Sequence, residues 1–320
     1  MPREAPKTGE DLSRPPIRRY AGPMVDAHTH TGSVAAADLL MRVARDYGID
    51  VLCGITHARH IPELQAAFGP RYRPIVWVEH DAVASPDRFA SENIRRLRDA
   101  RRRGAVAAKF WYTPRFLDET GFRFDNHALN PVFETLAKLA MPALVHLADP
   151  DCWFQTRYAD RRRYGAKIEH YDQLEHTLAR FPGLTVIGAH LGGHPEDLDH
   201  LRRLLDAYPN YYLDSSATKW IARELSLQPD AARAFLVERS ERILFGSDLV
   251  AFDDATPAHY ASRWWVHRWL WEGQGTRPSP IPDPCAPWRD GPQVHGLNLP
   301  DDCLARLYAG NARRLLGVET

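Results

Sequence analysis

The chain has 320 residues, of which 44% are hydrophobic and 26% charged, and its 41 Lys and Arg balance 41 Asp and Glu. This is the composition of a globular protein with enough length for one large core or two smaller ones. The lack of net charge argues against a nucleic acid or an anionic membrane as partner. The arginine clusters at 101–103 and 161–163 are local, and an exposed helix end or loop explains them as well as a binding patch does.

The cysteine pattern and the absence of sorting signals predict a cytoplasmic protein. Cys53, Cys152, Cys285 and Cys303 form no CxxC pair and no regular framework, which fits free thiols in a reducing compartment. The first ten residues contain no apolar stretch typical of a signal peptide, and no apolar run of 18 residues follows. We therefore expect neither a cleaved leader nor a membrane span.

The predicted elements alternate regularly along the chain. Residues 1–22 are rich in proline and charge and are predicted to form an N-terminal arm, followed by a single domain over 23–320. Short apolar runs typical of buried strands then alternate with stretches of helical periodicity. Strands are predicted at 24–27, 50–55, 74–78, 105–110, 143–147, 184–189, 211–214 and 242–246. Helices are predicted at 36–47, 85–103, 130–140, 171–180, 195–207, 230–239 and 304–316.

Eight strands alternating with helices predict a parallel sheet with βαβ crossovers, closed into a (β/α)8 TIM barrel. A doubly wound open sheet is the alternative, and the lack of a Gly-rich phosphate loop after the first strand disfavours it. Two connections are unusually long, at 148–170 and at 249–300. The second holds four tryptophans and four prolines and is predicted to be an inserted lid-like loop. A surface subdomain or a dimer contact is the other interpretation.

Residues suited to metal binding end several predicted strands. In VDAHTH at 25–30, His28 and His30 point to the same side of a strand. The later strands end in Lys109 (fourth), His146 (fifth), His190 (sixth) and Asp248 (eighth). In a barrel these positions share the C-terminal face, and histidines with a carboxylate are the ligands that zinc prefers. The sequence therefore predicts a divalent metal site, most simply for Zn²⁺.

The same residues lie in motifs that resemble the amidohydrolase superfamily, specifically its amidohydrolase-2 branch of hydrolases and decarboxylases. The motifs are VDAHTH at 25–30, AAKFW at 107–111, PALVH at 142–146, GAHLGG at 188–193, LFGSD at 244–248 and YAGNARRLLG at 308–317. They span nearly the whole chain after residue 24. Together they are specific for the superfamily but not for a substrate.

The resemblance implies a role for each strand-end residue. His28, His30 and His146 would be metal ligands, with Asp248 both a ligand and the catalytic proton shuttle. His190 would bind a second metal or act as a catalytic acid or base, and Asp26 would support the ligands. Lys109 would be carboxylated and bridge two ions, or stay unmodified and face a substrate carboxylate.

The residues around the predicted mouth indicate a small organic substrate, cyclic and with one anionic group. Candidates for binding it are Trp111, Tyr112, Trp153, Arg157 and Phe252, with Phe252 nearest the metal. The resemblance implies metal-dependent hydrolysis of an ester, lactone or amide. Non-oxidative decarboxylation of an unsaturated or aromatic acid is the alternative, and a metal-binding protein without activity is the third reading. Homo-oligomer formation stays open.

Overall fold

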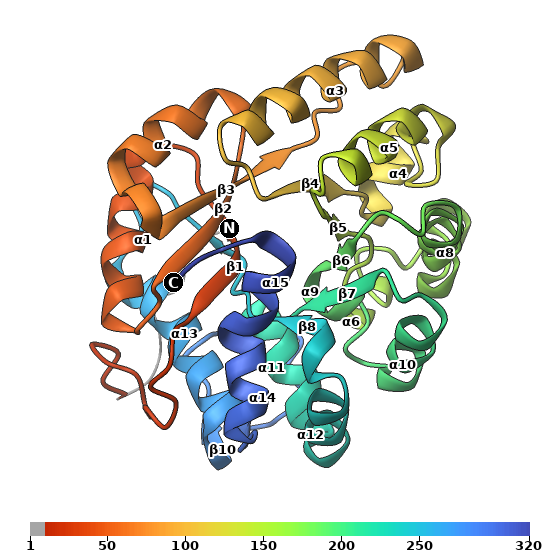
Figure 1. Cartoon of the computed structure of the whole chain (residues 1–320). Coiled ribbons are helices and arrows are strands. Elements are labelled where there is room, and N and C mark those ends of the chain that lie inside the picture. Colours follow the sequence, from red (N-terminus) through yellow and green to blue (C-terminus); the bar gives the residue numbers. More distant parts are fainter. Residues whose placement is uncertain (1–9) are drawn as a thin grey trace. The chain divides into compact units, whose positions relative to one another are not determined.

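The computed structural model describes residues 10–320 (Figure 1). These residues form two compact units. Unit 1 contains the described residues up to Gly54, together with 63–72 and 215–320. Unit 2 contains 55–62 and 73–214. The first nine residues of the predicted N-terminal arm lie outside the described range. The rest of the arm packs on unit 1, where the Tyr20 backbone N–H donates to the Glu272 carboxylate at 2.9 Å.

Unit 2 is organised around parallel strands that follow one another in chain order. The strands are β3 (Tyr72–Trp77), β4 (Ala107–Trp111), β5 (Ala143–His146), β6 (Val186–Gly188) and β7 (Tyr211–Asp214). Each pairs in parallel with the next, as in the register Lys109 to Leu144. Their near-continuous apolar character suits strands that are covered on both faces.

Helices connect these strands. They are α3 (Pro86–Arg102), α4 (Pro114–Thr120), α5 (Asn130–Lys138), α6 (Asp151–Phe154), α7 (Arg161–Tyr164), α8 (Tyr171–Arg180), α9 (Ala189–Gly192) and α10 (Leu198–Ala207). Of these, α3, α5, α8 and α10 lie along the outer side of the strands in Figure 1. Pro114 and Pro131 stand in the first turns of α4 and α5, where a missing N–H has no consequence. The short helices α6 and α7 lie in the long connection after β5.

Unit 1 contains the first and last parts of the chain. Its strands are β1 (Val25–His30), most of β2 (Val51–Thr56), β8 (Ile243–Leu244) and β9 (Leu249–Val250), with a hairpin of β10 (Gln274–Pro278) and β11 (Gln293–Leu297). Its helices are α1 (Val34–Asp46), most of α2 (Ile61–Phe68), α11 (Thr218–Leu227), α12 (Pro229–Glu238), α13 (Pro257–Glu272), α14 (Asp301–Ala305) and α15 (Asn311–Leu316). β1 and β9 pair in parallel with Thr29 opposite Leu249.

All eight predicted strands are present, with ends that differ by a few residues. The predicted helices are present too, whereas α2, α4, α6, α7, α9, α11 and α13 were not predicted. The interpretation of 249–300 as a loop is wrong in its local structure, because α13 and the hairpin occupy most of it. Trp264, Trp265 and Trp271 of α13 are at most 1% exposed, so these rings form core. A role for this segment as a lid stays a prediction.

The cysteines only partly match the expectation of four reduced thiols. Cys53 and Cys303 are free and buried. Cys152 and Cys285 are disulfide-bonded, so the expectation is wrong for these two residues. Within residues 10–320, the helices are all too short or too polar to cross a bilayer.

Candidate functional site

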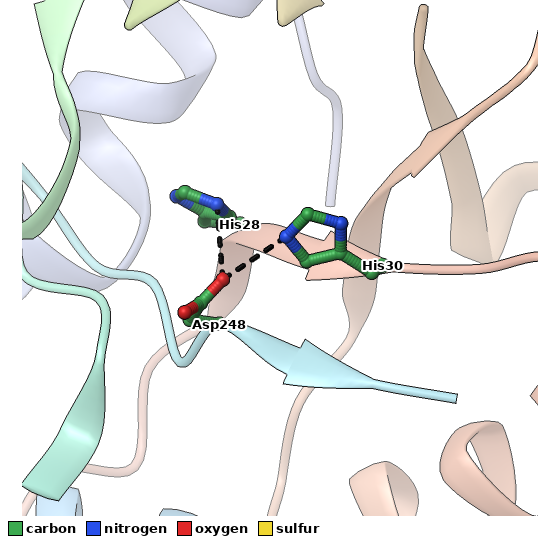
Figure 2. A group of neighbouring side chains, drawn as sticks. All are labelled: His28, His30 and Asp248. Carbon is green, nitrogen blue, oxygen red and sulfur yellow. Dashed lines mark hydrogen bonds and ion pairs between the residues drawn. The ribbon is translucent and has the colours of Figure 1, made fainter. Parts of the chain in front are cut away.

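Two histidines and one aspartate of unit 1 converge at the end of β1. His28 Nε2 lies 3.3 Å and His30 Nε2 3.0 Å from the same oxygen, Oδ1 of Asp248. Figure 2 shows both rings turned toward that carboxylate, which stands just before β9. Alternation along β1 explains why the two histidines share a side, with the intervening Thr29 facing away. The predicted pairing of His28, His30 and Asp248 is therefore present in unit 1.

The backbone next to Asp248 holds its carboxylate in place. The Asp248 N–H donates to the His28 carbonyl at 2.8 Å, and the Ala27 N–H donates to the Phe245 carbonyl at 2.9 Å. Asp248 has a φ of +62°, a left-handed conformation that aspartate tolerates better than most residues. After Asp248 the chain continues as β9, which runs parallel to β1.

The buried carboxylate of Asp26 holds the backbone of His28 in place. Asp26 is 0% exposed and accepts hydrogen bonds from the backbone N–H groups of His28 at 3.2 Å and Ser247 at 3.0 Å. The Trp264 indole donates to its other oxygen at 2.9 Å. Burial raises the pKa of Asp26 to about 6, against the lowering effect of these donors. Asp26 therefore ties β1, the turn before Asp248 and α13 together.

The three side chains fit a metal ion by chemistry and by spacing. Their ligand atoms lie within 4.8 Å of one another. Ligands bound at 2.0–2.1 Å to a tetrahedral ion lie roughly 3.3 Å apart, close to the separations seen here. The second nitrogen of His28, Nδ1, lies 2.9 Å from Ser216 Oγ, a contact that fixes the ring in the way that metal-binding histidines are commonly fixed. His28, His30 and Asp248 are thus a suitable donor set for a divalent ion.

Unit 2 holds a second group of polar residues at strand ends. His146 ends β5, and its Nδ1 lies 3.2 Å from Nε2 of His190, the second residue after β6. The other nitrogen of His146 lies 3.1 Å from Asp149, which accepts a hydrogen bond from the Tyr158 hydroxyl at 2.8 Å. Burial raises the pKa of Tyr158 well above its ordinary value, so this hydroxyl remains a donor.

His190 is held in an uncommon backbone conformation. Its φ is +60° and that of Leu191 is +50°. The Asp214 carboxylate at the end of β7 accepts a hydrogen bond from the His190 N–H at 2.9 Å, which anchors this turn. Such conformations in residues other than glycine are commonly found at functional sites. Lys109 of β4 is only 1% exposed, and its place in the metal site stays a prediction.

The predicted substrate-binding residues have different surroundings. Trp111 is 36% exposed at the end of β4, while Tyr112 is 1% exposed and its hydroxyl lies 3.1 Å from His80. Phe252 packs against His259 with 5.1 Å between ring centroids. The Arg157 guanidinium stacks over Trp153 at 3.8 Å and lines a cavity in unit 2. Their role in binding a substrate stays a prediction.

Several supporting residues were not identified from the sequence. Ser216 and Trp264 contact the site from parts of the chain far from β1, and no local pattern marks them. Asp214 carried a usable signal, because it ends a predicted strand just as His146 does. Asp149 carried a usable signal too, because it lies only three residues after His146.

Parallel strands in alternation with helices, with histidines and aspartates at strand ends, are typical of a TIM barrel that carries a candidate metal site. The sequence profile of the Amidohydro_2 family, described as amidohydrolase, matches residues 13–318, and the chain belongs to this family. No curated protein matches the chain. The predicted superfamily and fold class are therefore confirmed.

Solved structures support the fold. An uncharacterised TIM-barrel protein from Bordetella bronchiseptica is 15% identical, with a TM-score of 0.56 over 92% of this chain and 99% of that one. The 2,6-dihydroxybenzoate decarboxylase from Rhizobium is 14% identical, with a TM-score of 0.56 over 93% and 99%. A putative 2-pyrone-4,6-dicarboxylic acid hydrolase from Pseudomonas putida is 12% identical, with a TM-score of 0.53 over 93% and 98%. At these identities the similarity shows the fold alone.

Proposed function

We propose that the protein is a metal-dependent hydrolase acting on an ester, lactone or amide carbonyl of a small organic substrate. The observation that carries the proposal is the convergence of His28 and His30 on Asp248 in a chain of the amidohydrolase family. Zinc or a similar divalent ion held there would lower the pKa of a water ligand toward roughly 7 and polarise the carbonyl. The side chains around the site would hold the ion and transfer the protons.

In this proposal His28, His30 and Asp248 would hold the ion, and Ser216 keeps the His28 ring from rotating. One Asp248 oxygen, Oδ1, faces the two histidine rings. The other oxygen points away from both rings in Figure 2, and we assign to it the transfer of a proton from water to the leaving group. His190 is proposed to supply a second acid or base, with its backbone fixed by Asp214.

Non-oxidative decarboxylation is the second candidate. It is favoured by the similarity in fold to 2,6-dihydroxybenzoate decarboxylase. In that reaction an acid such as the His190 imidazolium would protonate the carbon that loses CO2.

Lys109 favours hydrolysis, because a carboxylated lysine in this position bridges two ions in the hydrolytic members that the sequence resembles. Incorporation of ¹³C-labelled CO2 at Lys109, followed by NMR, tests that modification directly.

The test uses the full chain stripped of metal by dipicolinate and reloaded with Zn²⁺. Zinc per chain is measured together with turnover of two carbonyl probes, p-nitrophenyl acetate and dihydrocoumarin, and of 2,6-dihydroxybenzoate. We expect His28→Ala and Asp248→Ala to lose zinc and at least about 100-fold of the hydrolytic rate. The matched control is His176→Ala, which removes a histidine whose side chain is 70% exposed.

Full zinc occupancy with normal turnover in His28→Ala would show that the ligand assignment is wrong. Zinc-dependent release of CO2 from 2,6-dihydroxybenzoate, without hydrolysis of either carbonyl probe, would replace hydrolysis by the second candidate. A fall in activity of equal size in His176→Ala would show that the losses reflect general damage to the fold.

A further inference from the structure

A cavity of about 360 Å³ lies in unit 2, away from its paired strands. Its walls come from α4 and from the connection after β5 that contains α6 and α7. The lining residues are Arg115, Asp118, Glu119, Arg157, Tyr158, Arg163 and Tyr164. The volume is within the range of small-molecule sites.

The charges in the cavity wall do not cancel. Arg163 donates two hydrogen bonds to Asp118, at 2.8 and 2.7 Å, and Arg115 donates to Glu119 at 2.7 Å. Two of the three guanidinium groups are thus neutralised by the two carboxylates. Arg157 has neither an ion pair nor a hydrogen bond to any other residue in 10–320, which leaves the cavity one positive charge.

The unpaired guanidinium is fixed in orientation. It stacks over the Trp153 ring with 3.8 Å between Arg157 Cζ and the ring centroid, a typical cation–π contact. Stacking occupies the face of the guanidinium and leaves its edge N–H groups available. Those edge donors match the two oxygens of a carboxylate in a bidentate pair.

Two tyrosines complete the wall. Tyr158 and Tyr164 pack with 5.0 Å between their ring centroids. The Tyr158 hydroxyl already donates its hydrogen bond to Asp149. Tyr158 therefore offers the cavity mainly an aromatic surface. The Tyr164 hydroxyl has no partner among the described residues and is available as a further donor.

We propose that this cavity binds the carboxylate of a small aromatic or unsaturated acid, with Arg157 as the bidentate anchor and the tyrosines against the apolar part. The ligand would carry one negative charge, since one guanidinium is unpaired. This goes beyond the proposed function, because binding here requires neither the metal nor turnover. The Tyr158 hydroxyl bond to Asp149, which in turn contacts His146, links the cavity wall to a histidine predicted to be a ligand.

The test is calorimetric titration of the full chain with sodium benzoate at constant ionic strength. We expect saturable binding with a Kd of about 1 mM. Arg157→Gln should weaken it about tenfold, and Arg157→Lys several-fold, since lysine keeps the charge and loses the fork. The matched control is Arg98→Gln on α3, which removes another exposed arginine charge of unit 2 without touching the cavity.

Benzamide, the neutral analogue of benzoate, should bind at least about tenfold more weakly if charge is recognised. Equal binding of benzamide, an unchanged Kd in Arg157→Gln, or no saturation by benzoate would overturn the proposal. Inorganic phosphate binding more tightly than benzoate would overturn the assignment to a carboxylate. Circular dichroism of each variant separates loss of binding from loss of folding, and Arg157→Lys provides a second reading if Arg157→Gln fails to fold.

Discussion

Gly246 lies against His28, the first of the proposed metal ligands, and replacing it by alanine should displace that side chain without removing any donor atom. A Cβ at this position would stand 2.8 Å from His28 Cβ and 3.2 Å from Ser216 Cβ. Ordinary contacts between carbon atoms are about 3.5–4.0 Å. His28 must therefore move by roughly 0.7 Å, several times the ~0.2 Å that a metal–ligand distance tolerates.

We expect Gly246→Ala to weaken zinc binding by about 10- to 100-fold, the usual effect of disturbing the surroundings of a ligand. Crowding at this buried position should also lower the free energy of unfolding by about 1–3 kcal/mol. Zinc affinity is measured by competition with a chromophoric chelator, and stability by urea unfolding of the metal-free protein. Gly32→Ala is the control, because nothing lies within 4 Å of its added Cβ.

The two readouts separate the possible failures of this reasoning. Unchanged zinc affinity in a Gly246→Ala variant that is less stable would refute the placement of His28 as a ligand. Unchanged stability together with unchanged affinity would refute the close approach of Gly246 to β1. A loss in Gly32→Ala equal to that in Gly246→Ala would show that any added methyl group near the site has this effect.

Three further predictions concern stability. Trp264→Phe removes the indole donor at 2.9 Å from buried Asp26 and should lower the free energy of unfolding by about 1–3 kcal/mol in urea. Burial lowers the pKa of His194 to about 4, whereas in the unfolded chain it is near 6.5. Between these two pH values the unfolded chain binds more protons, so the free energy of unfolding should fall by ~3 kcal/mol as the pH drops from 6.5 to 4. His194→Gln should make this fall smaller. Burial likewise lowers the pKa of Arg263 to about 10, and among the described residues its guanidinium donates only to the His259 carbonyl and Ser262 Oγ. Arg263→Met should therefore raise the unfolding free energy by about 1 kcal/mol, and a clear fall would contradict this.

Some parts of the chain escaped prediction because their pattern does not reveal their surroundings. Helix α13 has apolar residues on all sides, with Trp264, Trp265 and Trp271 buried. A helix buried all round lacks the one-sided periodicity by which helices are recognised. The run of tryptophans therefore suggested a lid, whereas the rings fill the core of unit 1.

The sequence by itself determined the strand order, the family and the pairing of His28 with His30, since alternation along a strand is a local property. It also marked Asp248, which lies beside both histidines in the structure, because this residue directly follows a recognisable strand. The tertiary structure alone decided that Ser216 fixes the His28 ring, that Trp264 binds Asp26, and that Gly246 leaves room for His28. These contacts join residues about 190 to 240 positions apart, and their geometry depends on packing between elements. No local spacing in the sequence encodes such contacts, so they follow only from the folded chain.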